Sequence, residues 1–257
     1  LKVCLVERNE VGHGVTSRTT AKLTFLQEII YQQIGNLDKA KLYFESQKEA
    51  IKIVEDIIEK ENIKCNYEKV DSYLFALDSK DKVLKEKGIL ESFGVKVKEI
   101  DKLPNNKEVK YGISVSNTAV FHPLKYLMGL KTAIEDKVDV YENTKVVDIR
   151  REDEYYLCRA NEHIIKTKKI VLALHYPYFL LPYMMPLKCH LEKSYIAAFK
   201  DENHHFSAIN ADKDTISIRY HQDDKQSYQL YLNGSHNIAF KNDEKGDPLV
   251  TSEGLAA

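Results

Sequence analysis

The sequence lacks the features that mark several large classes of protein. It contains no tryptophan, and its four cysteines stand at positions 4, 65, 158 and 189. No two of them form a C-x-x-C pair, so the spacing excludes a disulfide framework or a zinc finger and predicts reduced, buried thiols in a cytoplasmic protein. Adjacent His204 and His205 would point to opposite faces of a strand with no third ligand nearby, so we expect no metal site.

The sequence also lacks an excess of charge and a long apolar run. Lys and Arg number 38 and Asp and Glu 39, which leaves a formal net charge of −1. This balance gives no electrostatic reason to expect a nucleic-acid partner. The most apolar stretch, Ile170 to Met185, is interrupted by His175 and by prolines and is too short to span a bilayer. We therefore expect neither a nucleic-acid partner nor a membrane span.

Glycine is missing where a dinucleotide fold would need it. Such a fold opens with a G-x-G-x-x-G loop, and the sequence contains none. It opens instead with Val3 to Val6, a short apolar run typical of a buried parallel strand, which ends at Glu7. A carboxylate at that place can accept hydrogen bonds from both hydroxyls of a ribose. Because residue 1 is Leu and not Met, we expect the natural protein to have further residues before it.

Hydrophobic periodicity predicts a mixed fold of the α+β or α/β class. Apolar stripes at helical spacing predict helices at 37–61, 80–93 and 124–134. Alternating residues predict strands at 65–77, 95–100, 145–149 and 155–160, and the wholly apolar segment 170–174 predicts a buried parallel strand. Four further strands at hairpin spacing predict a separate antiparallel sheet, at 195–199, 206–209, 215–220 and 228–232.

The segment VERNEVGHGVTSRTTAKLT, residues 6–24, resembles a known cofactor-binding segment. It is similar to the part that follows the second strand in FAD-dependent amine and amino-acid oxidoreductases of the D-amino-acid oxidase superfamily. The bacterial branch resembling gamma-glutamylputrescine oxidoreductase is the most similar, and its longer members often carry a C-terminal Rieske domain. The resemblance implies FAD as the cofactor, with Glu7 at the adenosine ribose and a loop along the pyrophosphate. The residues of this segment implied to bind FAD are Glu7, Arg8, Gly14, Thr16, Ser17, Thr20, Ala21 and Lys22.

Later segments extend the resemblance along nearly the whole chain. The strand that contains Val147 is similar to a family strand whose backbone contacts the adenine. The strand 170–174 would return to the parallel sheet and bring Ala173 to FAD, although Leu174 replaces the usual threonine. Residues 217–219 and 233–236 are similar to two segments of the antiparallel sheet that covers the flavin in the family.

The catalytic residues remain unknown, with His122 and Arg219 as candidates. His122 precedes Pro123 at the expected start of a helix, and Pro is favoured in a first helical turn. The histidine either caps or packs against that helix or faces the flavin and substrate. Arg219 either lies near the substrate or occupies the solvent face of its strand.

The resemblance implies two domains and a reaction. An incomplete, Rossmann-like FAD-binding domain would comprise residues 1–64 and 138–180, and a substrate-binding domain residues 65–137 and 181–240, followed by a polar tail at 241–257. The implied reaction oxidises an amine or amino acid by hydride transfer to the flavin N5. One alternative is a non-catalytic fragment that does not bind FAD alone and acts through missing terminal segments, a Rieske domain or another partner. A second alternative, an NAD-dependent dehydrogenase, also fits Glu7.

Overall fold

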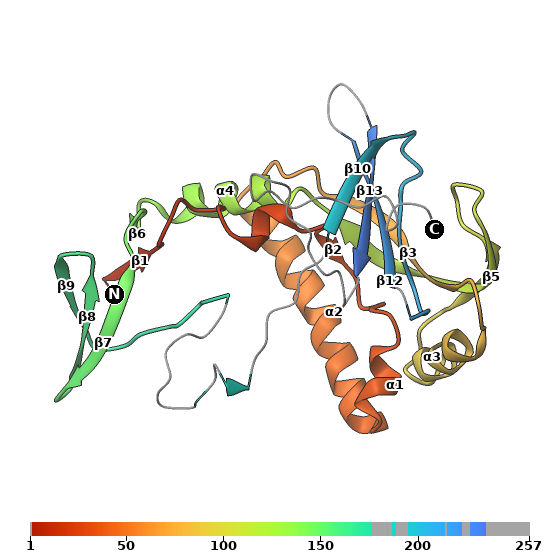
Figure 1. Cartoon of the computed structure of the whole chain (residues 1–257), viewed down its shortest axis with the longest axis horizontal. Helices are drawn as coiled ribbons and strands as arrows, with labels where there is room; N and C mark the ends of the chain where they lie inside the picture. The colour runs from red at the N-terminus through yellow and green to blue at the C-terminus, as the bar shows by residue number, and fades with distance from the viewer. Residues whose placement is uncertain are drawn as a thin grey trace, which may run out of the picture. The chain divides into compact units, whose positions relative to one another are not determined.

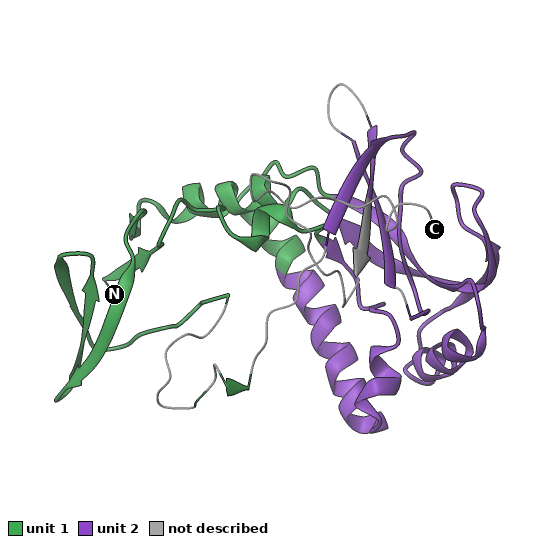
Figure 2. Cartoon of the chain, viewed as in Figure 1, with its two compact units in different colours: residues 1–21, 54–67, 121–191 green, residues 22–53, 68–120, 192–257 purple. Residues whose placement is uncertain are grey.

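The chain divides into two compact units, which Figure 2 shows in two colours. The computed structural model describes residues 2–175, 184, 187–188, 195–213, 215–222 and 227–234, with the backbone alone for 231–234. Unit 1 comprises residues 1–21, 54–67 and 121–191, and unit 2 comprises residues 22–53, 68–120 and 192–257. The long helix at residues 37–60 contributes residues to both units.

The elements of both units follow one another along the chain as labelled in Figure 1. Those of unit 1 are β1 (Val3–Val6), the 3-10 helix η1 (Val15–Arg18), α4 (Pro123–Ile134), β6 (Val138–Tyr141), β7 (Val146–Glu152), β8 (Tyr155–Ala160) and β9 (His163–Thr167). Those that lie in unit 2 or begin there are β2 (Lys22–Leu23), α1 (Ile30–Ile34), α2 (Leu37–Lys60), β3 (Glu68–Ala76), α3 (Asp81–Ser92), β4 (Lys98–Lys102), β5 (Glu108–Val120), β10 (Tyr195–Lys200), β11 (Phe206–Asn210), β12 (Thr215–Gln222) and β13 (Ser227–Gly234). The predicted helices at 37–61, 80–93 and 124–134 are therefore confirmed.

Unit 2 is built on an eight-stranded sheet in the order β10-β13-β12-β11-β3-β5-β2, with β4 paired to β5. Its pairs are antiparallel except for β11 and β3, which run parallel. The four predicted hairpin strands are confirmed as β10 to β13, and they join the earlier strand pair β3–β5 in one sheet. Strand β3 is buried on both faces, because Leu74 packs with residues of α1, α2 and α3 while Phe75 packs with Phe206 and Ile218.

Glu86 on α3 is fully buried in unit 2 and holds α1 in place. Its carboxylate accepts hydrogen bonds from the backbone amides of Tyr31 at 2.9 Å and Gln32 at 3.2 Å, and from Gln32 Nε2 at 2.8 Å. Burial raises the pKa of the Glu86 carboxyl, and these donors oppose the rise. In the sequence Glu86 is one of many charges on its helix, so periodicity alone does not distinguish it.

Replacing Glu86 with Ala is expected to lower the free energy of unfolding by about 2–4 kcal/mol, because one buried and two partly buried donors lose their acceptor. Glu86→Gln keeps an acceptor oxygen and is expected to cost roughly half as much. Urea unfolding of the two variants and the parent measures both changes. A loss below about 0.5 kcal/mol in Glu86→Ala, the range of ordinary surface substitutions, would contradict this role.

Unit 1 contains two smaller sheets in its described part. Strands β1 and β6 form a parallel pair, with Val3 opposite Val138, and β7, β8 and β9 form an antiparallel sheet. The sequence predicted β1 as a parallel strand, which is confirmed, but as a buried one, which is wrong: Val3 is 42 % and Leu5 39 % exposed. Strand β6 was not predicted, because four residues carry too little periodicity.

The predicted strand at 170–174 is wrong. These residues have no regular secondary structure, and Val171 is 88 % exposed. A wholly apolar strand is stable between neighbouring strands with helices on both faces. In the described part of unit 1 the parallel sheet is the pair β1 and β6, and the segment at 170–174 pairs with neither strand.

The cysteines follow the prediction in part. Cys65 and Cys158 are buried free thiols whose pKa is raised by burial, whereas Cys4 is exposed and Cys189 lies outside the described residues. In the part of the chain that the structure describes, no helix is long and apolar enough to cross a membrane.

Candidate functional site

Glu7 stands at the carboxyl end of β1, the end of a parallel strand at which α/β sheets bind ligands. Its backbone is fixed on both sides: Glu7 N donates to Tyr141 O, and Thr144 N donates to Glu7 O, both at 2.8 Å. One carboxylate oxygen, Oε1, accepts the Asn9 amide at 2.8 Å. The carboxylate is thus held in one orientation by the loop that follows it.

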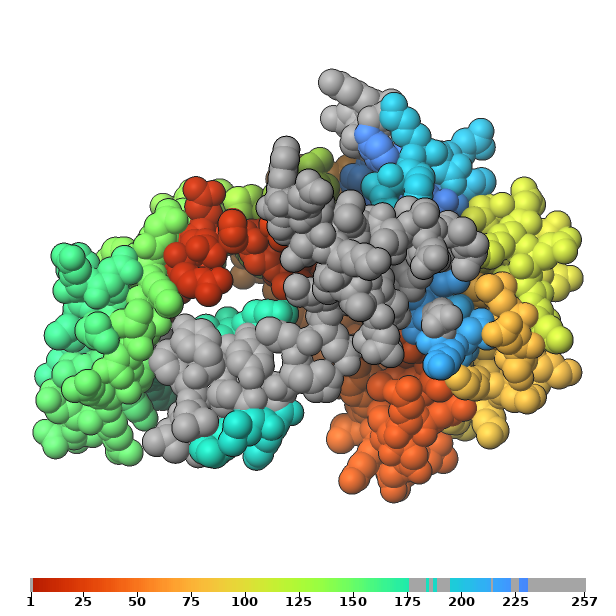
Figure 3. Space-filling view, in the orientation of Figure 1, coloured from red at the N-terminus to blue at the C-terminus, as the bar shows by residue number. Residues whose placement is uncertain are grey.

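The loop after Glu7 presents polar groups at the surface. Arg8, Gly14 and Thr16 are exposed, and the red segment at the start of the chain is visible on the face drawn in Figure 3. Gly14 precedes η1, and Ser17 Oγ donates to Gly14 O at 3.1 Å. Three of the loop residues that the resemblance assigned to FAD, Arg8, Gly14 and Thr16, are therefore accessible at the surface.

Ala21, at the end of this segment, is buried in a left-handed backbone conformation with φ +47°. A non-glycine residue in that region is strained by about 1 kcal/mol or more, and such strain gathers at functional sites. Its amide donates to Thr19 Oγ1 at 3.3 Å, which helps to hold the turn, and neighbouring Thr20 is buried.

Val147 lies at a β-bulge of β7. Val146 is opposite Ala160 and Asp148 is opposite Arg159, so Val147 is the extra residue of the bulged strand. A bulge leaves this residue outside the regular ladder, which suits a backbone contact to a ligand. Ala173, by contrast, is exposed in the irregular segment described above, so the structure does not bring it into the parallel sheet with β1.

A second group of predicted residues lies on the sheet of unit 2. Lys22 Nζ donates to Ser217 Oγ at 2.5 Å and is 3.4 Å from Ala208 O. Arg219, which is only 2 % exposed, lies two residues beyond Ser217 on β12, on the same face. The solvent-facing alternative for Arg219 is therefore wrong. We call the following residues the polar cluster: Lys22, Ser72, Ser207, Ser217 and Arg219.

The polar cluster concentrates positive charge. Burial lowers the pKa of Lys22 to about 8 and that of Arg219 to about 10, while the charge of Arg219 lowers the pKa of Lys22 further. Glu28 and Glu68 oppose these shifts. The oxygens that Lys22 contacts belong to a hydroxyl and a peptide carbonyl, and Ser72 and Ser207 are hydroxyls bonded to each other at 2.9 Å. An anion bound here would stabilise both cations.

His122 caps α4, as one of its two alternatives predicted. Its Nδ1 accepts the Lys125 amide at 3.3 Å, and its own amide donates to Cys65 O at 2.7 Å. His205 lies before β11, where its Nδ1 pairs with Glu68. Across the residues that the structure describes, no group of three His, Cys, Asp or Glu side chains is arranged to hold a metal ion.

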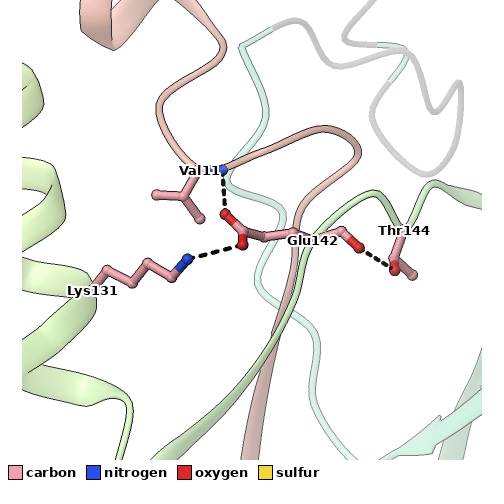
Figure 4. Close-up of polar contacts among 4 residues, drawn as sticks. All are labelled: Val11, Lys131, Glu142 and Thr144. Carbon is pink, nitrogen blue, oxygen red and sulfur yellow. Dashed lines mark hydrogen bonds and ion pairs between the residues drawn. The ribbon is translucent and has the colours of Figure 1, made fainter.

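Glu142, which no local pattern in the sequence indicates, contacts the loop that follows β1. Figure 4 shows its carboxylate between two donors: Val11 N at 2.7 Å and Lys131 Nζ at 2.9 Å. Thr144 Oγ1 donates to the Glu142 backbone oxygen at 2.8 Å. No sequence signal marks this contact, because Val11 and Glu142 are 131 residues apart.

Residues 233–236, which resemble the second family segment of the antiparallel sheet, lie only partly within the described residues. Asn233 and Gly234 end β13, whereas Ser235 and His236 lie outside the described residues.

Known proteins and a family model match nearly the whole chain. The family model described as FAD dependent oxidoreductase (DAO) matches residues 1–256. The chain is 27 % identical over 243 residues to the putative Rieske 2Fe-2S iron-sulfur protein YhfW of Bacillus subtilis, covering 91 % of this chain and 48 % of that protein. It thus spans about half the length of the curated relatives it matches.

Solved structures share the fold at low sequence identity. Glycine oxidase from Geobacillus kaustophilus superposes with a TM-score of 0.65 at 12 % identity, covering 95 % of this chain and 68 % of that one. L-proline dehydrogenase from P. horikoshii superposes with a TM-score of 0.67 at 14 % identity, covering 95 % and 67 %. The mixed fold with a parallel and an antiparallel sheet is confirmed by these neighbours.

Proposed function

Because this chain belongs to the DAO family of FAD-dependent oxidoreductases, we propose that it takes part in the oxidation of an amino acid. The observation that carries this choice of substrate is the polar cluster, in which Lys22 and Arg219 bring two cations to one face of a buried sheet. An amino acid carries a carboxylate that two such cations can bind, and a simple polyamine carries none.

The FAD-binding role is proposed for unit 1. Glu7 would accept the ribose hydroxyls, since Oε1 is held by Asn9 and the carboxylate has further acceptor positions. The surface groups of Arg8, Gly14, Thr16 and Ser17 would hold the pyrophosphate, and the bulged backbone at Val147 the adenine. Thr20 and Ala21 remain proposed contacts to the rest of FAD, whereas Lys22 belongs to unit 2 and Ala173 lies in the irregular segment at 170–174. When bound, FAD supplies an acceptor for the hydride that leaves the carbon beside the amine.

The substrate role is proposed for unit 2. Arg219 would bind the carboxylate with its planar guanidinium, which matches two oxygens at once. Lys22, held by Ser217, would supply a second positive charge. The names of glycine oxidase and L-proline dehydrogenase, both of which specify an amino acid, support an amino acid as the substrate class. Amine oxidation without a carboxylate is the less favoured form of the same proposal.

A second candidate is that the chain holds FAD weakly by itself and functions with a partner polypeptide. The observation that favours it is the exposure of Val3, Leu5 and Val171, apolar residues that a parallel sheet ordinarily buries. A Rieske domain is the partner that we propose, supported by the name of the B. subtilis relative. The family match argues against the NAD-dependent dehydrogenase.

Titration of the purified chain with FAD, followed by anaerobic addition of amino acids, tests the proposal. We expect saturable changes in the flavin spectrum and bleaching of the flavin bands by an amino acid, with no comparable bleaching by NADH. If NADH reduces the flavin and amino acids do not, the result would contradict the proposed function. Stoichiometric flavin in the chain as purified would contradict the second candidate.

A further inference from the structure

The contact between Glu142 and the loop at residues 8–14 joins three distant parts of unit 1. Glu142 follows β6, Lys131 lies on α4, and Val11 lies in the loop after β1. The side chains of Lys131 and Glu142 are about equally and only partly exposed, at 31 % and 30 %. Donation from the Val11 amide, and then from Lys131, lowers the pKa of the Glu142 carboxyl. The carboxylate is therefore charged at neutral pH and acts as an acceptor for both groups.

Glu142 holds the loop at the Val11 amide, and other contacts hold it before and after this residue. The start of the loop is tied by Asn143 N to Asn9 O and by Thr144 N to Glu7 O, both at 2.8 Å. Beyond Val11, Gly12 has φ +91° and lies so close to α4 that an added Cβ would be 2.6 Å from Leu124 Cδ1. The bond to Glu142 thus sets the path between the ribose residue, Glu7, and the pyrophosphate residues from Gly14 onward.

The charge of Glu142 makes Lys131 necessary. A carboxylate beside a loop that binds a diphosphate repels that diphosphate through the Coulomb interaction. Lys131, at 2.9 Å from the carboxylate, cancels this charge without occupying the loop. The pair combines a strong acceptor for the Val11 amide with local neutrality.

We propose that Glu142 and Lys131 are positioning residues for the dinucleotide, Glu142 by holding the Val11 amide and Lys131 by neutralising Glu142. This inference rests on the proposed FAD-binding function of unit 1. It predicts that the two residues act through the loop and through charge, and that they do not touch the reacting atoms.

Four variants separate these roles: Glu142→Ala, Glu142→Gln, Lys131→Met and the double variant Lys131→Met with Glu142→Gln. Lys125→Met is the matched control, because Lys125 lies on the same helix and its side chain donates to Asn66 Oδ1 and not to Glu142. Two readouts are taken for each variant: amide hydrogen exchange at Val11, and the FAD dissociation constant from fluorescence titration at low and high salt.

Glu142→Ala is expected to speed exchange at Val11 and to raise the FAD dissociation constant by roughly tenfold, the effect of one charge-assisted hydrogen bond. Lys131→Met is expected to give a similar rise at low salt that shrinks at high salt, because ions screen the uncompensated carboxylate. The FAD dissociation constants of Glu142→Gln and of the double variant should lie within about threefold of the parent value. The amide oxygen of glutamine still accepts the Val11 N–H and carries no charge.

Unchanged exchange at Val11 in Glu142→Ala would overturn the contact itself. Faster exchange with an unchanged dissociation constant would overturn the positioning role. A second result would overturn the role of Lys131: the FAD dissociation constant of Lys131→Met rises equally at low and high salt, and adding Glu142→Gln does not lower it. If the parent chain shows no FAD binding while exchange at Val11 responds as expected, the proposed function fails, and the role toward the dinucleotide fails with it.

Discussion

Replacing Glu7 with Ala is expected to raise the FAD dissociation constant by about 10- to 100-fold. The two ribose hydroxyls would each donate a hydrogen bond to the charged carboxylate. Each such bond contributes about 1.5–3 kcal/mol, and in the variant water replaces part of it. Glu7 is already oriented by the Asn9 amide, so little entropy is lost when a ribose binds. Fluorescence titration of the parent and the variant measures the change.

Glu10→Ala is the control for the Glu7 experiment. Glu10 is an exposed carboxylate in the same loop, and the bond that His13 N forms is to its backbone oxygen, which alanine retains. We expect the control to bind FAD at least as tightly as the parent, because the change removes an exposed carboxylate from the loop and no acceptor for the ribose. A Glu7→Ala variant that remains folded and binds FAD as tightly as the control would remove Glu7 from the cofactor site.

Replacing Arg219 with Met is expected to weaken binding of a carboxylate ligand by roughly 100-fold, the equivalent of about 3 kcal/mol for a lost bidentate ion pair. Methionine is the suitable replacement because its unbranched, uncharged side chain fills similar space. Calorimetric titration with a short monocarboxylate such as propionate measures the loss. Equal affinity in the parent and the variant would contradict the carboxylate-binding role.

Lys22 gives the same cluster a dependence on pH. With a pKa lowered to about 8, its side chain is mostly charged at pH 7 and mostly neutral at pH 10. An anion binds the charged form, so propionate affinity should fall as pH rises through 8, by about tenfold overall. Lys22→Met should show the weaker affinity and no slope up to about pH 9, below the pKa of about 10 at which Arg219 loses its charge. Lys200→Met, which replaces an exposed lysine on β10, should keep the slope. A slope that survives in Lys22→Met would assign the titration to another group.

Elements that carry their own periodicity could be predicted from the sequence. The stripe of α2 and the alternation of β10 to β13 are local patterns, and both correspond to elements of the structure within a few residues. The position of Glu7 at the end of β1 could be predicted for the same reason, because the apolar run before it is contiguous. The helix cap at His122 also follows from a local signal, the proline that comes next.

Features that depend on distant partners could not be predicted. The bond between Glu142 and Val11 and the contact of Lys22 with Ser217 join residues 131 and 195 positions apart, and no pattern in one segment reveals the other. The segment at 170–174 has the composition of a buried strand, yet composition does not supply the neighbouring strands that such a strand needs. The burial of Arg219 likewise comes from the sheet around β12 and not from its own alternating sequence.

The most direct test of the account compares two reductants of the FAD-saturated chain under anaerobic conditions: an amino acid, and the amine that lacks only its carboxylate, such as alanine and ethylamine. If Lys22 and Arg219 bind the carboxylate, alanine should bleach the flavin at least about 100-fold faster at equal concentration, and Arg219→Met should remove most of that advantage. Equal bleaching rates for the two compounds would contradict carboxylate binding by Lys22 and Arg219. A faster rate with alanine that persists in Arg219→Met would contradict it as well.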